Sequence, residues 1–298
     1  MSGSRPAVLS GSWYAADPER LATEVDAYLA AAEPAAAPAG RPLVAVAPHA
    51  GFAYSGPSAG KVFGILSGWD FARIVILAPN HRVPVENIAL SGADRYLTPL
   101  GEVPVDTDAV ARLAAAVGFS VQDAAHDPEH AVEIQLPFLQ RSWPGAVPAI
   151  VPLLVPAGAR DRTQAAAALA ELRDERTLLL VSTDFTHFGS AYGFTPFADD
   201  IPASLERLDS GAIVRIMGAD ADGLRAYGRR TGITMCGLEA AALALDCGLP
   251  PGYEGALLDY RRSGDRDRDY SLSVSYAAIL LSSGDHSQGA RRAGPPHV

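Results

Sequence analysis

The stretch Leu43-Val-Ala-Val-Ala-Pro-His-Ala-Gly51 joins a short apolar run to a proline and a histidine. A second stretch, Arg73-Ile-Val-Ile-Leu-Ala-Pro-Asn-His81, repeats that order thirty residues later. Short apolar runs rich in β-branched residues are typical of strands that are buried on both faces. Proline cannot continue a central strand, because it lacks the N–H that the sheet needs. The sequence therefore predicts two buried strands that each end beside a histidine.

A third apolar run, residues 177–182, leads into Thr183-Asp-Phe-Thr-His-Phe-Gly189. In open α/β sheets, ligands bind outside the carboxyl ends of the parallel strands. We therefore expect the three strand ends, each of which carries a histidine or an aspartate, to converge on one pocket.

Strands and helices alternate through most of the chain, which predicts an α/β fold: a single domain over residues 1–281, with a mostly parallel central sheet flanked by helices. Residues 1–9 are expected to be loosely held. Residues 282–298 are polar and contain glycine and proline, so they are expected to form a disordered tail, in which His286 and His297 have no role. The main helices are expected at residues 17–32, 57–66, 106–117, 130–139, 161–173, 202–217, 220–228 and 237–246.

Composition narrows the classes of protein. The chain has 298 residues and a net charge of −10, which argues against a nucleic-acid partner. Two cysteines are too few for a disulfide framework and fit a reducing cytoplasm. No apolar run reaches the about 18 residues of a membrane-spanning helix, and no signal peptide precedes the first strand. We expect a cytoplasmic protein with neither nucleic acid nor membrane as its partner.

His49 and His81 are the leading candidates for metal ligands, because imidazole is the commonest metal ligand and each follows a strand in a turn that proline stiffens. The alternative is that each histidine only caps a strand. Cys236 precedes an expected helix, whose N-terminus favours the thiolate that binds metals or attacks as a nucleophile. A purely structural role for Cys236 stays open, and Cys247 is expected to be a core residue.

Asp184 and His187 come from one loop, and their i, i+3 spacing lets both face the pocket if the loop turns helically. Asp184 is a candidate to orient an imidazole, with an N-cap as the alternative. His187 is a candidate to bind metal or to move protons. His130 and Glu133 are expected one turn apart on a helix, which is a weak signal. The chain contains no Walker loop, no G-x-G-x-x-G and no G-x-S-x-G motif.

Seven blocks, in order from residue 11 to about residue 281, resemble the Memo family, whose prokaryotic members are called AmmeMemoRadiSam system protein B. The blocks are Gly11-Ser-Trp-Tyr14, Ala47-Pro-His-Ala-Gly-Phe-Ala-Tyr-Ser-Gly56, Leu77-Ala-Pro-Asn-His81, Glu129-His-Ala-Val-Glu-Ile-Gln-Leu-Pro-Phe138, Ser182-Thr-Asp-Phe-Thr-His-Phe-Gly189, Met235-Cys-Gly237 and Ser273-Val-Ser-Tyr-Ala277. They span nearly the whole chain.

The resemblance implies a fold similar to that of class III extradiol dioxygenases, which use non-haem iron(II). It implies that His49, His81 and Cys236 bind the metal, and that Asp184 and His187 line the same pocket. In the dioxygenases a glutamate completes the ligand set, so the cysteine would stand in its place. Thiolate is a softer ligand than carboxylate and shifts the preference toward copper or zinc. The expected metal is iron(II) or copper, with zinc as a further alternative.

Three functions are expected from these residues together with the resemblance. The first is a metal-dependent, dioxygenase-like oxidoreductase for a small molecule, in which His187 moves protons with Asp184 or Tyr54 in support. The second is a metal-binding or peptide-binding module without catalysis. The third is a zinc hydrolase with Glu133 or Asp184 as the base. The family's prokaryotic name also suggests a partnership with a radical-SAM protein and an AMMECR-type protein.

Overall fold

The computed structural model describes residues 3–284, and within them the main sheet has nine strands. Eight lie in the order β10-β12-β2-β9-β3-β8-β4-β7, and β11 pairs with β12 outside this path. Their bounds are β2 (Pro42–Ala47), β3 (Arg73–Pro79), β4 (Ile88–Leu90), β7 (Phe119–Val121), β8 (Ala149–Val155), β9 (Thr177–Ser182), β10 (His187–Gly189), β11 (Glu254–Arg262) and β12 (Leu272–Ser282). A smaller sheet has the order β1-β5-β6, formed by β1 (Ser4–Arg5), β5 (Arg95–Thr98) and β6 (Gly101–Pro104).

The centre of the main sheet is parallel: β9 lies between β2 and β3, and β8 continues on the other side of β3. The strands that flank this centre, β12 and β4, are antiparallel to their inner neighbours, so the sheet as a whole is mixed. The α/β prediction is confirmed, and the parallel centre holds the three strands that were expected to meet at one pocket.

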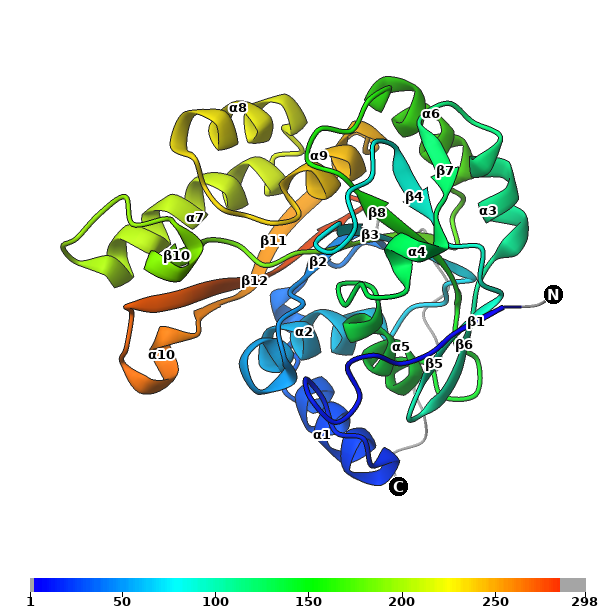
Figure 1. Cartoon of the computed structure of the whole chain (residues 1–298), viewed down its shortest axis with the longest axis horizontal. Helices are drawn as coiled ribbons and strands as arrows, with labels where there is room; N and C mark the ends of the chain where they lie inside the picture. Colours follow the sequence, from blue (N-terminus) through cyan, green and yellow to red (C-terminus); the bar gives the residue numbers. More distant parts are fainter. Residues whose placement is uncertain (1–2, 285–298) are drawn as a thin grey trace.

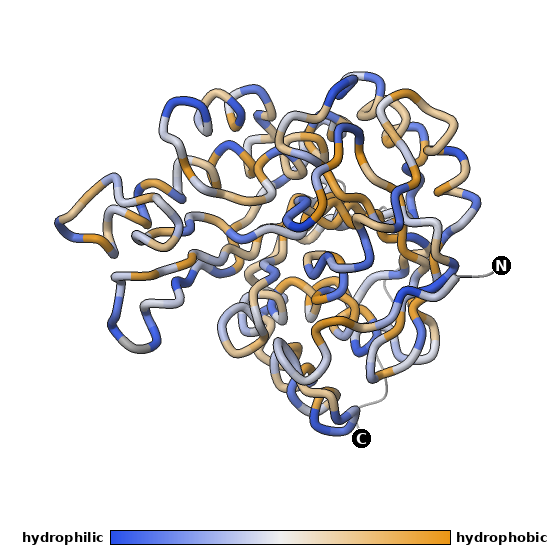
Figure 2. The backbone as a smooth tube through the Cα atoms, viewed as in Figure 1, coloured by the Kyte–Doolittle hydropathy of each residue, from blue (hydrophilic) through white to orange (hydrophobic). Residues whose placement is uncertain are grey.

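Helices cover both faces of the sheet, which gives three layers (Figure 1). One layer contains α1 (Pro18–Ala30), α2 (Phe52–Leu66) and α5 (Leu136–Ser142). The other contains α3 (Thr107–Ala114), α6 (Arg162–Leu172), α7 (Ile201–Met217), α8 (Ala221–Thr231) and α9 (Leu238–Asp246). Short helices α4 (Asp123–His126) and α10 (Gly264–Asp267) lie in connections, with 3-10 turns at Pro34–Ala36, Glu133–Gln135 and Ser190–Tyr192. The central strands are the most hydrophobic segments (Figure 2). Within residues 3–284, no helix is long and apolar enough to cross a membrane.

Helix α2 begins at Phe52, five residues before the expected start at Pro57. Its first turn forms because the Gly51 carbonyl accepts hydrogen bonds from the amides of Tyr54 and Ser55, and the Ser55 hydroxyl donates to the Ala50 carbonyl at 2.7 Å. Pro57 therefore lies inside the helix and does not open it. This early start places Tyr54 in the first turn of the helix, with its side chain exposed.

Helices α1 and α2 pack closely because glycines recur on one face of α2. At Gly60 a Cβ atom would overlap the carbonyl group of Tyr28, and at Gly56 it would overlap the ring of the same tyrosine. Each site has an ordinary helical backbone, so the glycines serve close approach between helices.

Three other expectations were wrong. Residues 130–139 do not form one helix: a 3-10 turn, Glu133–Gln135, precedes α5, and His130 lies before both. The loop from Asp184 to His187 makes no helical turn, because its amides bond to distant partners and His187 opens strand β10. Residues 4–9 are not loosely held, since Arg5 is buried in the small sheet; residues 1–2 lie outside the described part of the chain. Strand β12 ends at Ser282; residues 285–298, with His286 and His297, lie outside the described residues.

Candidate metal centre

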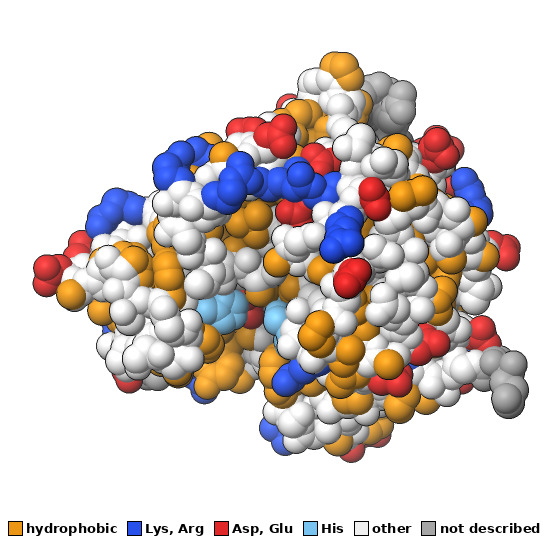
Figure 3. Space-filling model, turned by 45° about the horizontal axis from the view of Figure 1, so that its top comes forward, with side chains coloured by type: hydrophobic (Ala, Val, Ile, Leu, Met, Phe, Trp, Pro, Cys, Tyr) orange, Lys and Arg blue, Asp and Glu red, His pale blue; other side chains and the backbone are white. Residues whose placement is uncertain are grey.

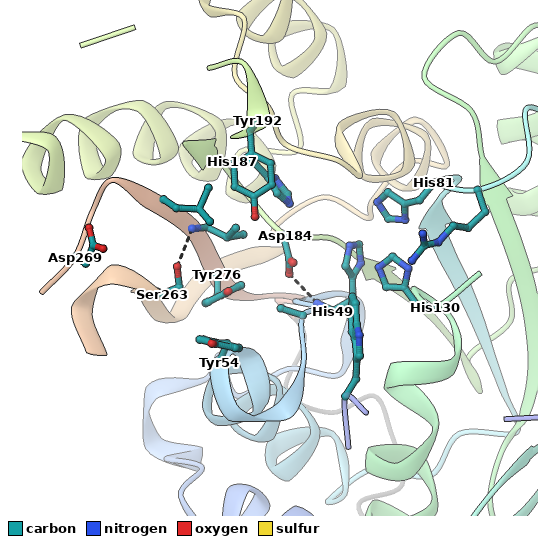
Figure 4. A pocket seen from close by; sticks show the side chains of 15 residues that line it. His49, Tyr54, His81, His130, Asp184, His187, Tyr192, Ser263, Asp269 and Tyr276 are labelled. Atoms are coloured by element: carbon teal, nitrogen blue, oxygen red, sulfur yellow. Dashed lines mark hydrogen bonds between the residues drawn. The ribbon is translucent and has the colours of Figure 1, made fainter. Parts of the chain in front are cut away.

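The carboxyl ends of β2, β9 and β3 open on one cavity of about 650 Å³. His49 follows β2, His81 follows β3, and Asp184 follows the strand between them. His130 and His187 complete a set of four imidazoles around it, and histidine side chains (pale blue) are visible at the hollow in Figure 3. The aromatic side chains of Trp13, Tyr54, Tyr192 and Tyr276 form much of the remaining wall (Figure 4). The expected convergence of strand ends is therefore present.

His49 is 2% exposed, and its hydrogen bonds determine which ring nitrogen carries the proton. Its Nδ1 lies 3.1 Å from the Ser182 hydroxyl, which donates its own proton to the Ala131 carbonyl at 2.6 Å. The hydroxyl can then only accept from His49, so the imidazole proton lies on Nδ1 and Nε2 keeps a free lone pair. Burial lowers the pKa of His49 well below its ordinary value, and the neighbouring histidines lower it further. The ring is thus neutral and ready to bind a metal.

His81 is held by the carboxylate of Glu129. One oxygen accepts the backbone amide of His81 at 2.7 Å, and the other lies 3.0 Å from its Nδ1. Because a carboxylate only accepts, Nδ1 carries the proton and Nε2 is free to bind a metal. This is the arrangement by which carboxylates commonly orient metal-binding histidines.

Cys236 lies just before α9, and its Sγ is 3.2 Å from Nε2 of His49. The backbone amide of Asp184 points to the same sulfur at 3.3 Å. Burial, reinforced by the charge of Asp184, raises the pKa of Cys236 to about 12. The helix N-terminus was expected to favour the thiolate; in the protein without metal, burial outweighs it. A bound cation would reverse this balance, since a coordinating thiol is deprotonated.

The donor atoms of His49, His81 and Cys236 all lie within 4.8 Å of one another. The two imidazole rings are nearly perpendicular, with centroids 5.2 Å apart. Two imidazole nitrogens and one thiolate suit iron, copper or zinc and are a poor set for magnesium or calcium. The residues present therefore fit the metals that the sequence suggested.

Asp184 and His187 both line the cavity, although no helical turn brings them there. Asp184 does not cap a helix; its Oδ1 accepts the amide of His49 at 2.8 Å, and burial raises its pKa. Nδ1 of His187 lies 3.0 Å from the carbonyls of Phe185 and Thr234, so it carries the proton and Nε2 remains free. Tyr54 is 50% exposed, at the cavity wall.

Glu129 and His130 have a place in the site that sequence reasoning missed. The ring of His130 stacks on that of His81, with centroids 4.6 Å apart. One oxygen of Glu129 also accepts the amides of His130 and Ala131, at 2.9 and 3.1 Å. Nδ1 of His130 is 3.0 Å from this oxygen but out of line for a good hydrogen bond. With so many N–H groups already directed at it, the carboxylate orients the histidines and leaves little room for a second cation. In the sequence, the signal for this role was the adjacent pair Glu129-His130 inside one of the blocks that resemble the Memo family.

Glu133 lies away from the cavity. It is completely buried and accepts the Tyr14 hydroxyl at 2.6 Å, two backbone amides of the N-terminal segment and the guanidinium of Arg5. Its contacts hold the N-terminal segment against the core.

Comparison with known proteins gives consistent matches. A family model described as "Memo-like protein" matches residues 5–280. A MEMO1 family protein of Thermococcus onnurineus is 33% identical over 248 residues, covering 79% of this chain and 85% of the relative. A second, from Methanopyrus kandleri, is 32% identical over 293 residues, covering 94% and 99%. Protein MEMO1 of Danio rerio is 30% identical over 292 residues, covering 93% and 97%.

Proposed function

The chain belongs to the family of Memo-like proteins, and from that premise we propose that it is a metal-dependent oxidoreductase acting on a small molecule in the cavity. His49, His81 and Cys236 would hold iron(II) or copper. The observation that carries the proposal is the convergence of these three donors. In both histidines the proton lies on Nδ1, which bonds to Ser182 in His49 and to Glu129 in His81, so each Nε2 is free to bind the metal.

When bound, the metal would supply redox and Lewis-acid chemistry at the base of the cavity. The protein's part is to keep each donor in place: Ser182 fixes the ring of His49, and Glu129 fixes that of His81. His187 offers a free Nε2 to the cavity and is the residue that would take a proton from the substrate or return it. Asp184 holds the backbone of His49 and faces the same space.

Zinc-dependent hydrolysis is a weaker candidate on this geometry. Glu133, one of its two expected bases, is buried beside Arg5 and does not line the cavity. Asp184 alone would have to activate water, while its Oδ1 is already bonded to the amide of His49.

Protein purified without oxygen should contain about one metal ion per chain, and His49→Ala, His81→Ala and Cys236→Ser should each lose most of it. Cys247→Ser is the matched control, because this second cysteine packs in the core and should leave the metal content unchanged. Oxygen consumption with catechols, thiols or ascorbate should exceed that of the free metal, and His187→Ala should lower it while the metal is retained.

If the metal-loaded protein turns over no faster than the free metal ion, the remaining function is a non-catalytic metal-binding or peptide-binding module. Retention of stoichiometric metal in all three ligand variants would remove the site. Co-purification from the native host would test the proposed partnership with a radical-SAM protein and an AMMECR-type protein.

A further inference from the structure

The segment that carries Asp184 and His187 is fastened residue by residue to other parts of the chain. The backbone amides of the five residues from Thr183 to His187 donate, in chain order, to β2, to the sulfur beside α9, to β12, to α7 and to the loop before α9. The acceptors are the Ala47 carbonyl, Cys236 Sγ, the Ser275 carbonyl, Asp209 Oδ1 and Thr234 Oγ1. Because no local hydrogen-bond pattern repeats within the segment, its shape depends on these partners.

Asp209 is the partner in this set that accepts through a carboxylate. It lies on α7 and is completely buried. Its Oδ1 accepts both the amide of Thr186, at 3.1 Å, and the hydroxyl of the same residue, at 2.6 Å. Its Oδ2 accepts the Tyr260 hydroxyl from β11, at 2.7 Å. Within residues 3–284 it forms no ion pair with a lysine, arginine or histidine.

A buried carboxylate without a cation is costly, and an apolar side chain would pack on this face of a helix with no such cost. The carboxylate can do what an apolar group cannot: with one oxygen it fixes two donors of a single residue. That residue, Thr186, stands between the two side chains that face the cavity and directly precedes His187.

We propose that Asp209 is a positioning residue for the metal centre: through Thr186 it sets the direction in which Asp184 and His187 face the cavity. The roles of those two side chains rest on the proposed function, while the positioning itself is a property of the protein without metal. The competing explanation is that Asp209 only ties α7 to β11 through Tyr260.

Two matched variants separate these explanations. Thr186→Val and Tyr260→Phe each remove one hydroxyl donor to Asp209, from hydrogen bonds of 2.6 and 2.7 Å, and should destabilise the fold by similar amounts. Only Thr186→Val changes a residue of the segment itself; the Tyr260 hydroxyl reaches the segment only through Asp209 and a 3.4 Å contact with the Ser275 hydroxyl. Asp209→Asn is the third variant: it keeps one acceptor oxygen and removes the charge.

The experiment uses the full-length protein without metal. Nitrogen-15 NMR of the His187 imidazole reports its tautomer and surroundings, and hydrogen exchange reports the amides of Thr186 and His187. Thr186→Val and Asp209→Asn should shift the imidazole signals and speed both amides by about tenfold, while Tyr260→Phe leaves both as in the parent protein. Equal effects of Thr186→Val and Tyr260→Phe, or an unchanged His187 in all variants, would overturn the proposal.

Should Asp209→Asn not fold, Thr186→Val and Tyr260→Phe alone decide the question. Metal binding by the parent protein is measured separately. A parent chain that binds no metal while Thr186→Val still displaces His187 would remove the proposed function and leave the positioning role standing.

Discussion

Replacing Glu129 with glutamine tests how the protein holds His81. The side chain is 1% exposed, and its carboxylate accepts four N–H groups: the amide and Nδ1 of His81 and the amides of His130 and Ala131. Glutamine has the same shape but only one acceptor oxygen. With that oxygen kept toward the three donors on one side, its NH₂ group faces the amide of His81, and two donors then meet in a part-buried contact.

An unsatisfied buried donor costs about 1–3 kcal/mol, and the weakening of charge-assisted hydrogen bonds adds to this cost. We expect Glu129→Gln to lower the free energy of unfolding by about 2–4 kcal/mol in urea titrations at neutral pH. Loss of a residue that orients a metal ligand typically weakens metal binding by about 10–100-fold, which a chelator competition with zinc would measure.

The pH dependence of this loss has a definite sign. Burial alone would raise the pKa of Glu129, but contacts with His130 and His81 outweigh it and hold the pKa below its ordinary value of 4.5. A depressed carboxyl pKa adds stability above pH 4.5, and this stability is lost as the pH falls below that value. The difference in free energy of unfolding between the parent protein and Glu129→Gln should therefore become smaller as the pH falls below 4.5.

Glu102→Gln is the control, because this carboxylate is 60% exposed and makes a surface ion pair with Arg95, which is worth at most about 1 kcal/mol. A Glu129→Gln protein with unchanged stability and unchanged zinc affinity would refute the orienting role.

Three further changes have expected outcomes. Cys236 in the metal-free protein should react with iodoacetamide at pH 8 about 10³-fold more slowly than a free thiol, because its pKa is raised from 9.0 to about 12 and little thiolate is present. Mass spectrometry of the alkylated peptide measures the rate, and a rate equal to that of the unfolded chain would contradict this expectation. Gly60→Ala should destabilise the fold by about 1–3 kcal/mol in urea, because its Cβ would overlap the carbonyl of Tyr28, whereas Gly158→Ala, with open space around it, should not. Arg5→Ala should cost about 3–5 kcal/mol in the same titration, because it removes the cation beside a buried Glu133, and a loss below 1 kcal/mol would count against that ion pair.

Much of the fold could be predicted from the sequence, because each central strand is a continuous apolar run that can be recognised from its own residues. Strand β9 has the predicted bounds, residues 177–182, because it is a continuous apolar run buried on both faces. The start of α2 could not be predicted, because Pro57 marks a typical helix start and the hydrogen bonds of the earlier turn are invisible in the composition. The first residues were misjudged for a related reason: Arg5 is held by Glu133, far along the chain.

The candidate site divides in the same way. His49, His81 and Asp184 could be selected because each follows a buried strand, and parallel strand ends share one edge of a sheet. The contacts of Glu129 with His81 and of Asp209 with Thr186 could not be derived from the local sequence, because each joins residues more than twenty positions apart. The pKa of Cys236 was expected to fall and instead rises, because burial exists only in the folded chain.

The most direct test of the metal centre is X-ray absorption spectroscopy of the protein loaded with one equivalent of zinc. The account predicts one sulfur at about 2.3 Å and two imidazole nitrogens at about 2.0–2.1 Å, with the sulfur lost in Cys236→Ser and kept in Cys247→Ser. A zinc ion surrounded only by nitrogen and oxygen in the parent protein would show that His49, His81 and Cys236 do not share a metal.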